Sequence, residues 1–271
     1  MFLRKRKNPV GYKIEERYIL PEELSETSGI ISYNNHIWTF NDSGGKPVIY
    51  SYSREKDSII QMITLDNTIN KDWEDIAQDK NYIYIGDFGN NMGTRDSLII
   101  YRINKSSIPL QGNTTIIPDR IIYKYPDYTP EKFPVSFSAF DCEAMITYND
   151  SLYVFTKNWT DGTTTIYGVP NVPGVFTAKM IKQLNAQGLI TGADYVDNKL
   201  ILIGYSNFIP FLWYFSTNDL YTLNEKNGIR IELNDIATYQ TEGICIDGDK
   251  VFITSEKTRS PAQLLQIDLE E

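Results

Sequence analysis

The chain has 271 residues, and 35 acidic against 26 basic side chains give it a net charge of −9 near neutral pH. This excess of negative charge argues against a nucleic-acid partner, because phosphate binding requires clustered lysine and arginine side chains. The longest apolar run, at 208–215, is far shorter than the ~18 residues of a membrane span, so we expect no transmembrane helix.

The N-terminal segment is basic and polar, and we expect residues 1–10 to form a disordered tail. Its cluster Arg4-Lys-Arg-Lys7 could open an export signal. However, Asn-Pro-Val-Gly-Tyr follows it, where a signal peptide needs an apolar core of ~7 to 15 residues. We therefore expect no signal peptide in this chain.

A short polar cluster followed by an apolar strand recurs five times along the remaining sequence. A second strand starts eight residues after each equivalent position, and these positions are Ser28, Glu74, Glu143, Thr191 and Glu242. Most of the intervals between copies are close to the ~40 to 50 residues of a four-stranded blade. The pattern predicts an all-β fold, a five-bladed β-propeller.

We expect residues 11–271 to form a single propeller domain with blades at about 28–64, 75–124, 143–183, 191–233 and 242–269. The last blade has only three strands of its own. The segment 12–20 has strand character and is predicted to complete that blade, which would close the ring and cover an open edge. The connections 104–118 and 125–140 are predicted to be surface loops.

Acidic side chains should gather at one mouth of the central channel. In a propeller, residues just before the first strands and just after the second strands of the blades meet at the same face. Crowded carboxylates there would repel one another, raise some pKa values and favour a bound cation. Glu74, Glu143 and Glu242 are the predicted metal ligands. Ca²⁺ is the predicted ion, because the chain offers many oxygen donors, one histidine and no cysteine cluster.

Further residues are predicted to bind a small polar ligand, with a carbohydrate or a phosphoester as the candidates. These residues are Ser28, Asp42, Asp75, Asp87, Lys157, Trp159, Thr191, Tyr205 and Glu256. The aromatic residues predicted near the mouth could stack on sugar rings or pack between blades. They are Trp73, Trp159, Phe208, Phe211 and Trp213. We expect a monomer.

Three other interpretations remain open. The mouth carboxylates could instead bind backbone amides of neighbouring blades and hold the ring together. They could also act in an enzyme, a hydrolase of a glycoside or phosphoester, with Glu143 or Glu242 as general acid and Glu74 or Asp75 as base or nucleophile. Finally, the loops at 104–140 and an apolar patch at 208–215 could make the protein an interaction scaffold. Cys142 and Cys245 are expected to be free structural thiols.

Several motifs carry a family resemblance that covers roughly residues 20–270. At Asp72-Trp-Glu-Asp-Ile-Ala77, Asn41-Asp-Ser-Gly-Gly45 and Tyr84-Ile-Gly-Asp-Phe-Gly-Asn-Asn91 the chain resembles a largely uncharacterised family of bacterial β-propeller proteins. More distantly it is similar to the esterase-like phytase and SdiA-regulated propellers. These likenesses imply an exported protein with a cation-assisted site, whereas the chain itself shows no export signal.

The leading hypothesis from the sequence is thus a ligand-binding propeller with an acidic, calcium-binding channel mouth and no established catalysis.

Overall fold

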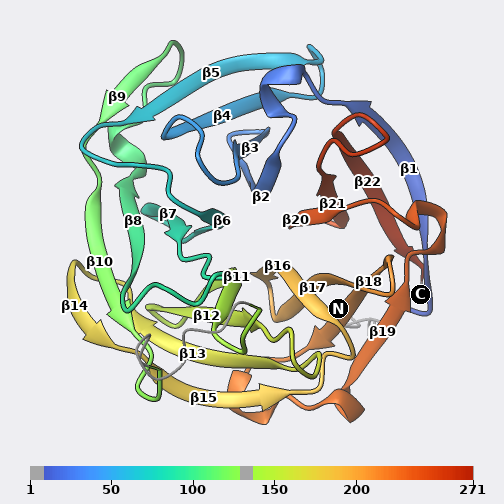
Figure 1. Cartoon of the computed structure of the whole chain (residues 1–271). Helices are drawn as coiled ribbons and strands as arrows, with labels where there is room; N and C mark the ends of the chain where they lie inside the picture. The colour runs from blue at the N-terminus through green and yellow to red at the C-terminus, as the bar shows by residue number, and fades with distance from the viewer. Residues whose placement is uncertain (1–8, 129–136, 271) are drawn as a thin grey trace, which may run out of the picture.

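Five β-sheets are arranged in a ring around a central channel in the computed structural model, which describes residues 9–128 and 137–270 (Figure 1). In each of them four antiparallel strands, each paired with the next, run outward from the central axis (Figure 1). The predicted five-bladed propeller is therefore confirmed. Among these residues no helix has the length and apolar character needed to cross a membrane.

The strands follow the predicted blades closely. Blade 1 contains β2 (Thr27–Tyr33), β3 (His36–Asn41), β4 (Val48–Ser53) and β5 (Ser58–Leu65). Blade 2 contains β6 (Trp73–Gln78), β7 (Tyr82–Asp87), β8 (Leu98–Asn104) and β10 (Asp119–Lys124). Blade 3 contains β11 (Asp141–Tyr148), β12 (Ser151–Lys157), β13 (Thr164–Pro170) and β15 (Lys179–Leu184). Blade 4 contains β16 (Leu189–Val196), β17 (Lys199–Ser206), β18 (Ile209–Ser216) and β19 (Gly228–Glu232).

Blade 5 joins the two ends of the chain, as predicted. Its strands β20 (Thr241–Asp247), β21 (Lys250–Ser255) and β22 (Gln263–Glu270) are completed by β1 (Gly11–Ile19). β1 pairs antiparallel with β22 from Gly11 opposite Glu270 to Ile19 opposite Gln263. Figure 1 shows this pairing of the first and last strands of the chain. Of the predicted disordered tail, residues 1–8 lie outside the described residues, and Val10 extends the ladder by donating to Glu270 O (2.7 Å).

Two short strands differ from the sequence prediction. The segment 104–118 was predicted to be a loop, but it contains β9 (Thr114–Ile116), which pairs in parallel with β5. The last part of the predicted third blade contains two strands, because β14 (Gly174–Thr177) pairs in parallel with β10 of blade 2 before β15 completes blade 3. Both additions cover the outer edge strand of a blade, which would otherwise present unpaired backbone groups.

Short 3-10 turns make up the remaining regular structure of the described residues: η1 (Glu22–Leu24), η2 (Lys105–Ser107), η3 (Leu220–Thr222), η4 (Glu225–Asn227) and η5 (Asn234–Ile236).

The apolar core lies between the blades. Each of five clusters of buried side chains joins two neighbouring blades, including the last and the first. Because both faces of a blade are covered, its strands are apolar almost throughout. β18 illustrates this, with every residue from Pro210 to Phe215 buried. The predicted apolar surface patch at 208–215 is therefore wrong, since Phe208 alone is largely exposed there. The other loop region proposed for a scaffold lies partly outside the described residues, at 129–136.

Every innermost strand contains a β-bulge at the same end. The register shifts fall between Thr27 and Ile30, Trp73 and Asp75, Cys142 and Ala144, Ile190 and Gly192, and Thr241 and Ile244. The five equivalent positions found in the sequence are thus bulged residues. A bulge turns a side chain out of the regular alternation of the strand. This is how Glu74, Glu143 and Glu242 come to point into the channel mouth instead of between the blades.

Side chains at the axis also join the innermost strands to one another. Asp75 accepts hydrogen bonds from Ile76 N (2.8 Å) and, across the blade boundary, from Met145 N (2.7 Å). The hydroxyl of Ser28 donates to Glu74 O (2.6 Å) and that of Thr191 to Thr241 O (2.7 Å). These contacts agree with the interpretation of Asp75, Ser28 and Thr191 as links between neighbouring blades.

We expect Asp75→Ala to lower the free energy of unfolding by about 1–3 kcal/mol, because the buried Met145 N–H would lose its acceptor. Urea denaturation would measure the loss. The matched control Asp268→Ala removes an exposed carboxylate on β22 and should stay within about 0.5 kcal/mol of wild type. Equal stability of the two variants would contradict a linking role for Asp75.

Candidate functional site

A cavity of about 490 Å³ opens at the mouth of the channel where the bulged residues lie. Such a volume suits a small-molecule ligand. Its lining comes from all five blades and from the loops next to their inner strands. The lining residues are Asp42, Ser43, Asp72, Glu74, Asn91, Phe137, Glu143, Lys157, Trp159, Tyr205, Phe208, Thr238, Tyr239, Gln240, Glu242 and Thr258.

Three carboxylates from blades 1 and 2 lie together in this cavity. One oxygen from each of Asp42, Asp72 and Glu74 lies within 4.8 Å of the other two. Asp42 follows β3, Asp72 precedes β6, and Glu74 is the bulged residue of β6. We refer to these three residues as the acidic triad. Oxygens so spaced can all reach one cation, since ligand oxygens at 2.3–2.6 Å from Ca²⁺ lie up to about 5 Å apart.

The buried side-chain amide of Asn70 holds the backbone around the acidic triad in place, and the backbone at Gly89 passes close to two of its carboxylates. Asn70 donates from Nδ2 to Asn41 O and Asp42 O (both 2.8 Å), which ties the loop after β3 to the segment before β6. On the other side the chain passes very near the carboxylates at Gly89. A Cβ there would lie 2.2 Å from Glu74 Oε1 and 2.4 Å from Asp72 Oδ2. A larger residue at that position would displace the Asp72 and Glu74 side chains.

The acidic triad lacks the donors that usually accompany buried carboxylates. Asp42 accepts from Ser43 N (2.5 Å), but the side chains of Asp72 and Glu74 accept no hydrogen bond from the described residues. Glu74 is only 7% exposed. Burial and the neighbouring carboxylates raise the pKa of Asp72 to about 6 and that of Glu74 well above its usual value. The site thus carries a charge that a proton or a cation must offset.

A buried ion pair forms the opposite wall of the cavity. Lys157 Nζ lies 3.1 Å from Glu143 Oε2, and both side chains are more than nine-tenths buried. The ammonium also faces the rings of Trp159 and Tyr205, at 4.8 and 5.5 Å from their centroids. Burial alone would lower the pKa of Lys157, but the carboxylates of Glu143 and Glu242 outweigh it and keep the lysine charged.

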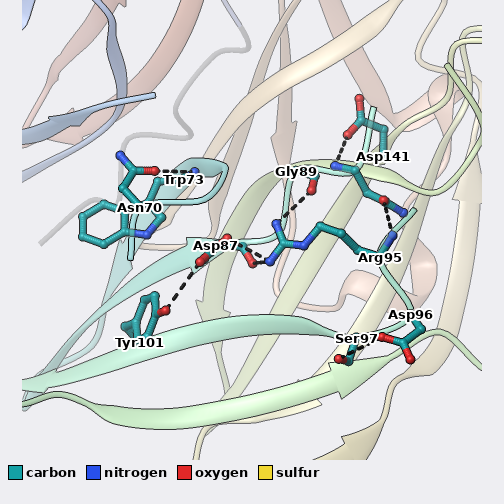
Figure 2. Close-up of polar contacts among 10 residues, drawn as sticks. Asn70, Trp73, Asp87, Gly89, Arg95, Asp96, Ser97, Tyr101 and Asp141 are labelled. Atoms are coloured by element: carbon teal, nitrogen blue, oxygen red, sulfur yellow. Dashed lines mark hydrogen bonds and ion pairs between the residues drawn. The ribbon is translucent and has the colours of Figure 1, made fainter. Parts of the chain in front are cut away.

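The loop after β7 is fixed by a buried arginine, as Figure 2 shows. Arg95 donates to Gly89 O (2.9 Å) and Asp87 O (2.7 Å), and its guanidinium pairs with the Asp87 carboxylate at 2.8 Å. Removing one partner of such a buried pair typically costs about 3–5 kcal/mol. Asp87, predicted to bind ligand, therefore lies behind the cavity wall and holds in place the loop that contains Gly89.

Asp141 connects the walls contributed by blades 2 and 3. One oxygen accepts the backbone N–H of Asn90 (2.7 Å; Figure 2), and the other accepts the indole N–H of Trp159 (2.8 Å). Two strong hydrogen bonds to a fully buried carboxylate fix the orientation of the Trp159 ring. The ring of Phe137 meets Trp159 edge to face at 4.9 Å. Asp141 is thus a positioning residue for the aromatic wall.

The structure brings together most of the predicted site residues. Seven of them line the cavity: Asp42, Glu74, Glu143, Lys157, Trp159, Tyr205 and Glu242. Glu256 lies next to it and accepts from Gln240 Nε2 (2.6 Å). The remaining four are not among the described lining residues, and their side chains make the contacts given above: Ser28, Asp75, Asp87 and Thr191. Of the predicted mouth aromatics, Trp73, Phe211 and Trp213 are buried between blades.

The carboxylates that could hold a metal differ in part from those predicted. Glu74 belongs to the acidic triad with Asp42 and Asp72, whereas Glu143 is paired with Lys157. Asp72 is not among the residues predicted from the sequence to bind a metal. A spacing of two residues in an extended segment puts Asp72 and Glu74 on one side of the chain, and this signal could have indicated the pair.

Both cysteines are free and buried, as predicted. Burial raises the pKa of the Cys142 thiol to about 12, so it stays protonated at neutral pH and is no nucleophile.

Comparison with known proteins identifies the fold. No family model matches the chain, and no curated protein matches it. A glutaminyl cyclase from Myxococcus xanthus is 14% identical with a TM-score of 0.57, over 97% of this chain and 100% of the other. The PQQ-bound aldose sugar dehydrogenase from Streptomyces coelicolor is 10% identical with a TM-score of 0.58, over 96% and 99%.

An exo-β-1,3-galactanase from Phanerochaete chrysosporium, in complex with β-1,3-galactotriose, is 10% identical with a TM-score of 0.54, over 93% of this chain and 64% of the other. At these identities the likeness establishes the β-propeller fold alone. The resemblance to a bacterial propeller family stays a prediction.

The cavity carboxylates generate a testable dependence of stability on pH. Burial, above all, raises the pKa of Asp72 to about 6, of Glu242 to about 7 and of Glu256 to about 9. In the unfolded chain these groups lose their protons near pH 4. A raised pKa stabilises the fold at low pH, and this contribution is lost as the pH rises through the folded-state value.

Without added cation we therefore expect the free energy of unfolding to fall between about pH 5 and about pH 9. Denaturation in EDTA across this range would measure the fall, and Glu242→Gln should flatten the part near pH 7. A stability that is constant or increases over the range would contradict the raised pKa values.

Proposed function

We propose that this propeller binds a divalent cation at the acidic triad and, beside it, a small polar ligand in the channel-mouth cavity. The observation that carries the proposal is the pair of unpartnered carboxylates. Asp72 and Glu74 lie within 4.8 Å of each other and of Asp42 without a hydrogen-bond donor among the described residues. Burying such charges is costly unless they are paired or coordinate a metal.

Calcium is the ion that best suits this donor set. All three ligands are carboxylate oxygens, which hard cations prefer, and the lining includes neither histidine nor cysteine among the described residues. Ca²⁺ accepts six to eight oxygens in flexible geometry, whereas Mg²⁺ needs a tighter octahedron. Three protein carboxylates would leave coordination positions on the cavity side for water or for ligand hydroxyls.

The remaining walls support a polar ligand that carries a ring. Trp159, Tyr205 and Tyr239 present aromatic surface, while Gln240 and Glu242 offer hydrogen-bonding groups. Two of the structurally similar proteins are a sugar dehydrogenase and a galactanase with a bound galactotriose. The likeness in fold supports a carbohydrate as the first ligand class to test.

We expect Ca²⁺ to raise the melting temperature, because a ligand that binds only the folded state adds stability of about 2.7 kcal/mol at a hundredfold excess over Kd. Thermal unfolding with EDTA, Ca²⁺ and Mg²⁺ would measure the shift. Asp72→Asn should abolish it, whereas the exposed control Asp268→Asn should retain it. A wild-type protein that binds no divalent cation in isothermal calorimetry would overturn the proposal.

A hydrolase is the second candidate, favoured by the environment of Glu242. This carboxyl is 6% exposed, and burial raises its pKa to about 7. A group with that pKa at neutral pH can donate a proton to a leaving oxygen, while the acidic triad binds the cation. Glu143 is less suited to this role, because Lys157 holds it in an ion pair.

We expect that, if the protein is a hydrolase, Glu242→Gln will lower kcat by about 10²- to 10⁴-fold with little change in ligand affinity. A panel of nitrophenyl glycosides and phosphate esters would supply the assay. In a pure binding protein the wild type turns over none of them, and the variant alters affinity alone.

A further inference from the structure

The rim of the cavity contains three residues in a backbone conformation that their side chains disfavour. Phe137, Phe208 and Thr238 have φ values of 59°, 65° and 71°, in the left-handed region. Every other described non-glycine residue with positive φ is an asparagine, aspartate or glutamine. Those residue types tolerate this region, whereas bulky and β-branched residues rarely adopt it. All three exceptions line this one cavity.

The strain at the rim is not offset by burial of the two aromatic rings. Phe208 is 78% exposed and Phe137 is 54% exposed. Backbone hydrogen bonds hold the conformations, from Phe137 N to Asn91 O (2.7 Å) and from Thr238 N to Phe208 O (2.8 Å). Strained residues that persist in this way are concentrated at active sites and ligand clamps. Here the strain presents apolar rings to solvent at the entrance of a polar cavity.

The floor beneath these rings is polar. It includes the acidic triad, the Lys157–Glu143 ion pair and the buried carboxyl group of Glu242. With a cation on the triad, which is the part of this inference that rests on the proposed function, two of its three negative charges are offset, and Lys157 and Glu143 neutralise each other. A floor of that kind offers oxygen acceptors, an ammonium donor and open cation positions to the hydroxyl groups of a ligand.

We propose that Phe137, Trp159 and Phe208 form an aromatic clamp for a neutral saccharide ring whose hydroxyls reach the polar floor. The two features complement each other chemically, since a pyranose has apolar C–H faces that pack on aromatic rings and a polar edge that hydrogen-bonds. Asp141 holds Trp159 for this contact, and Phe137 packs edge to face on Trp159. Phe208 extends from the turn between β17 and β18 to complete the rim.

The test uses the backbone strain at Phe208. A substitution that relieves this strain and removes the ring should weaken saccharide binding without lowering the melting temperature. In Phe208→Asn the new residue tolerates the left-handed region and loses little burial, so we expect the melting temperature to equal or exceed that of wild type. Saccharide affinity should fall about tenfold, as expected for one lost aromatic contact.

Phe208→Leu keeps the bulk and the strain but lacks the aromatic face, so it should lose affinity without gaining stability. Tyr221→Asn is the matched control, because Tyr221 is an exposed aromatic residue on η3 outside the cavity. It should leave affinity unchanged.

The probe is an array of neutral oligosaccharides screened with Ca²⁺ present, followed by calorimetry on the tightest binder. Binding that weakens in both Phe208 variants and is retained in the control supports the clamp. No saccharide bound by the folded wild-type protein, or tighter binding of organic amines, overturns it. Unchanged affinity in Phe208→Asn also overturns the clamp, even if Ca²⁺ still binds. Saccharide binding by a wild-type protein that binds no divalent cation would instead reject the cation proposal and leave the clamp standing.

Discussion

Closure of the ring is the constraint on which the rest of this structure depends. Each blade has two apolar faces and can bury both of them only between two neighbours. Pairing of β1 with β22 completes blade 5, and the cluster that includes Leu24 and Phe252 then joins that blade to blade 1. Without this pairing two faces would lie open to water, at a cost of about 25 cal/mol for each Å² of apolar surface.

The closed ring forces the innermost strands close together at the axis. A Cβ on Gly192 would lie 2.4 Å from Glu242 O, and one on Gly243 would lie 2.4 Å from Ser28 O. Bulges at the mouth end of these strands turn one residue of each out of this crowded arrangement. Two of the bulged residues, Ser28 and Thr191, donate to backbone carbonyls of the neighbouring blades, and the three glutamates line the cavity. The residues at the β-bulges thus link neighbouring blades and also place acidic side chains at the channel mouth.

The cavity differs from the scaffold around it in two physical respects. Its carboxylates are buried without enough donors, whereas Asp75 at the axis accepts two backbone N–H groups. Its rim also contains bulky residues in left-handed conformations, whereas the other described non-glycine positions with positive φ are asparagine, aspartate and one glutamine. Both features cost stability in the isolated protein. Departures from local consistency of this kind are expected where a sequence has been shaped by function.

The sequence by itself determined the five blades, the strand that closes the ring and the face at which the acidic residues gather. These features follow from local periodicity and from the fixed offset between the first two strands of each blade. Both signals can be recognised in the sequence without knowing which distant residues are in contact. The parallel pairings of β9 and β14 could not be predicted, because they depend on which edge strand remains exposed after the blades assemble.

Tertiary structure alone decided the role of each polar residue. Asp72 with Glu74 and Asp141 with Glu143 share the same spacing in sequence. Asp72 nevertheless faces the cavity, while Asp141 is bound by the Asn90 backbone and the Trp159 indole. One of these donors, the Asn90 backbone, comes from another blade. Because a carboxylate's protonation and partners depend on burial and on groups far away in the chain, no local pattern could distinguish a ligand from a link between blades.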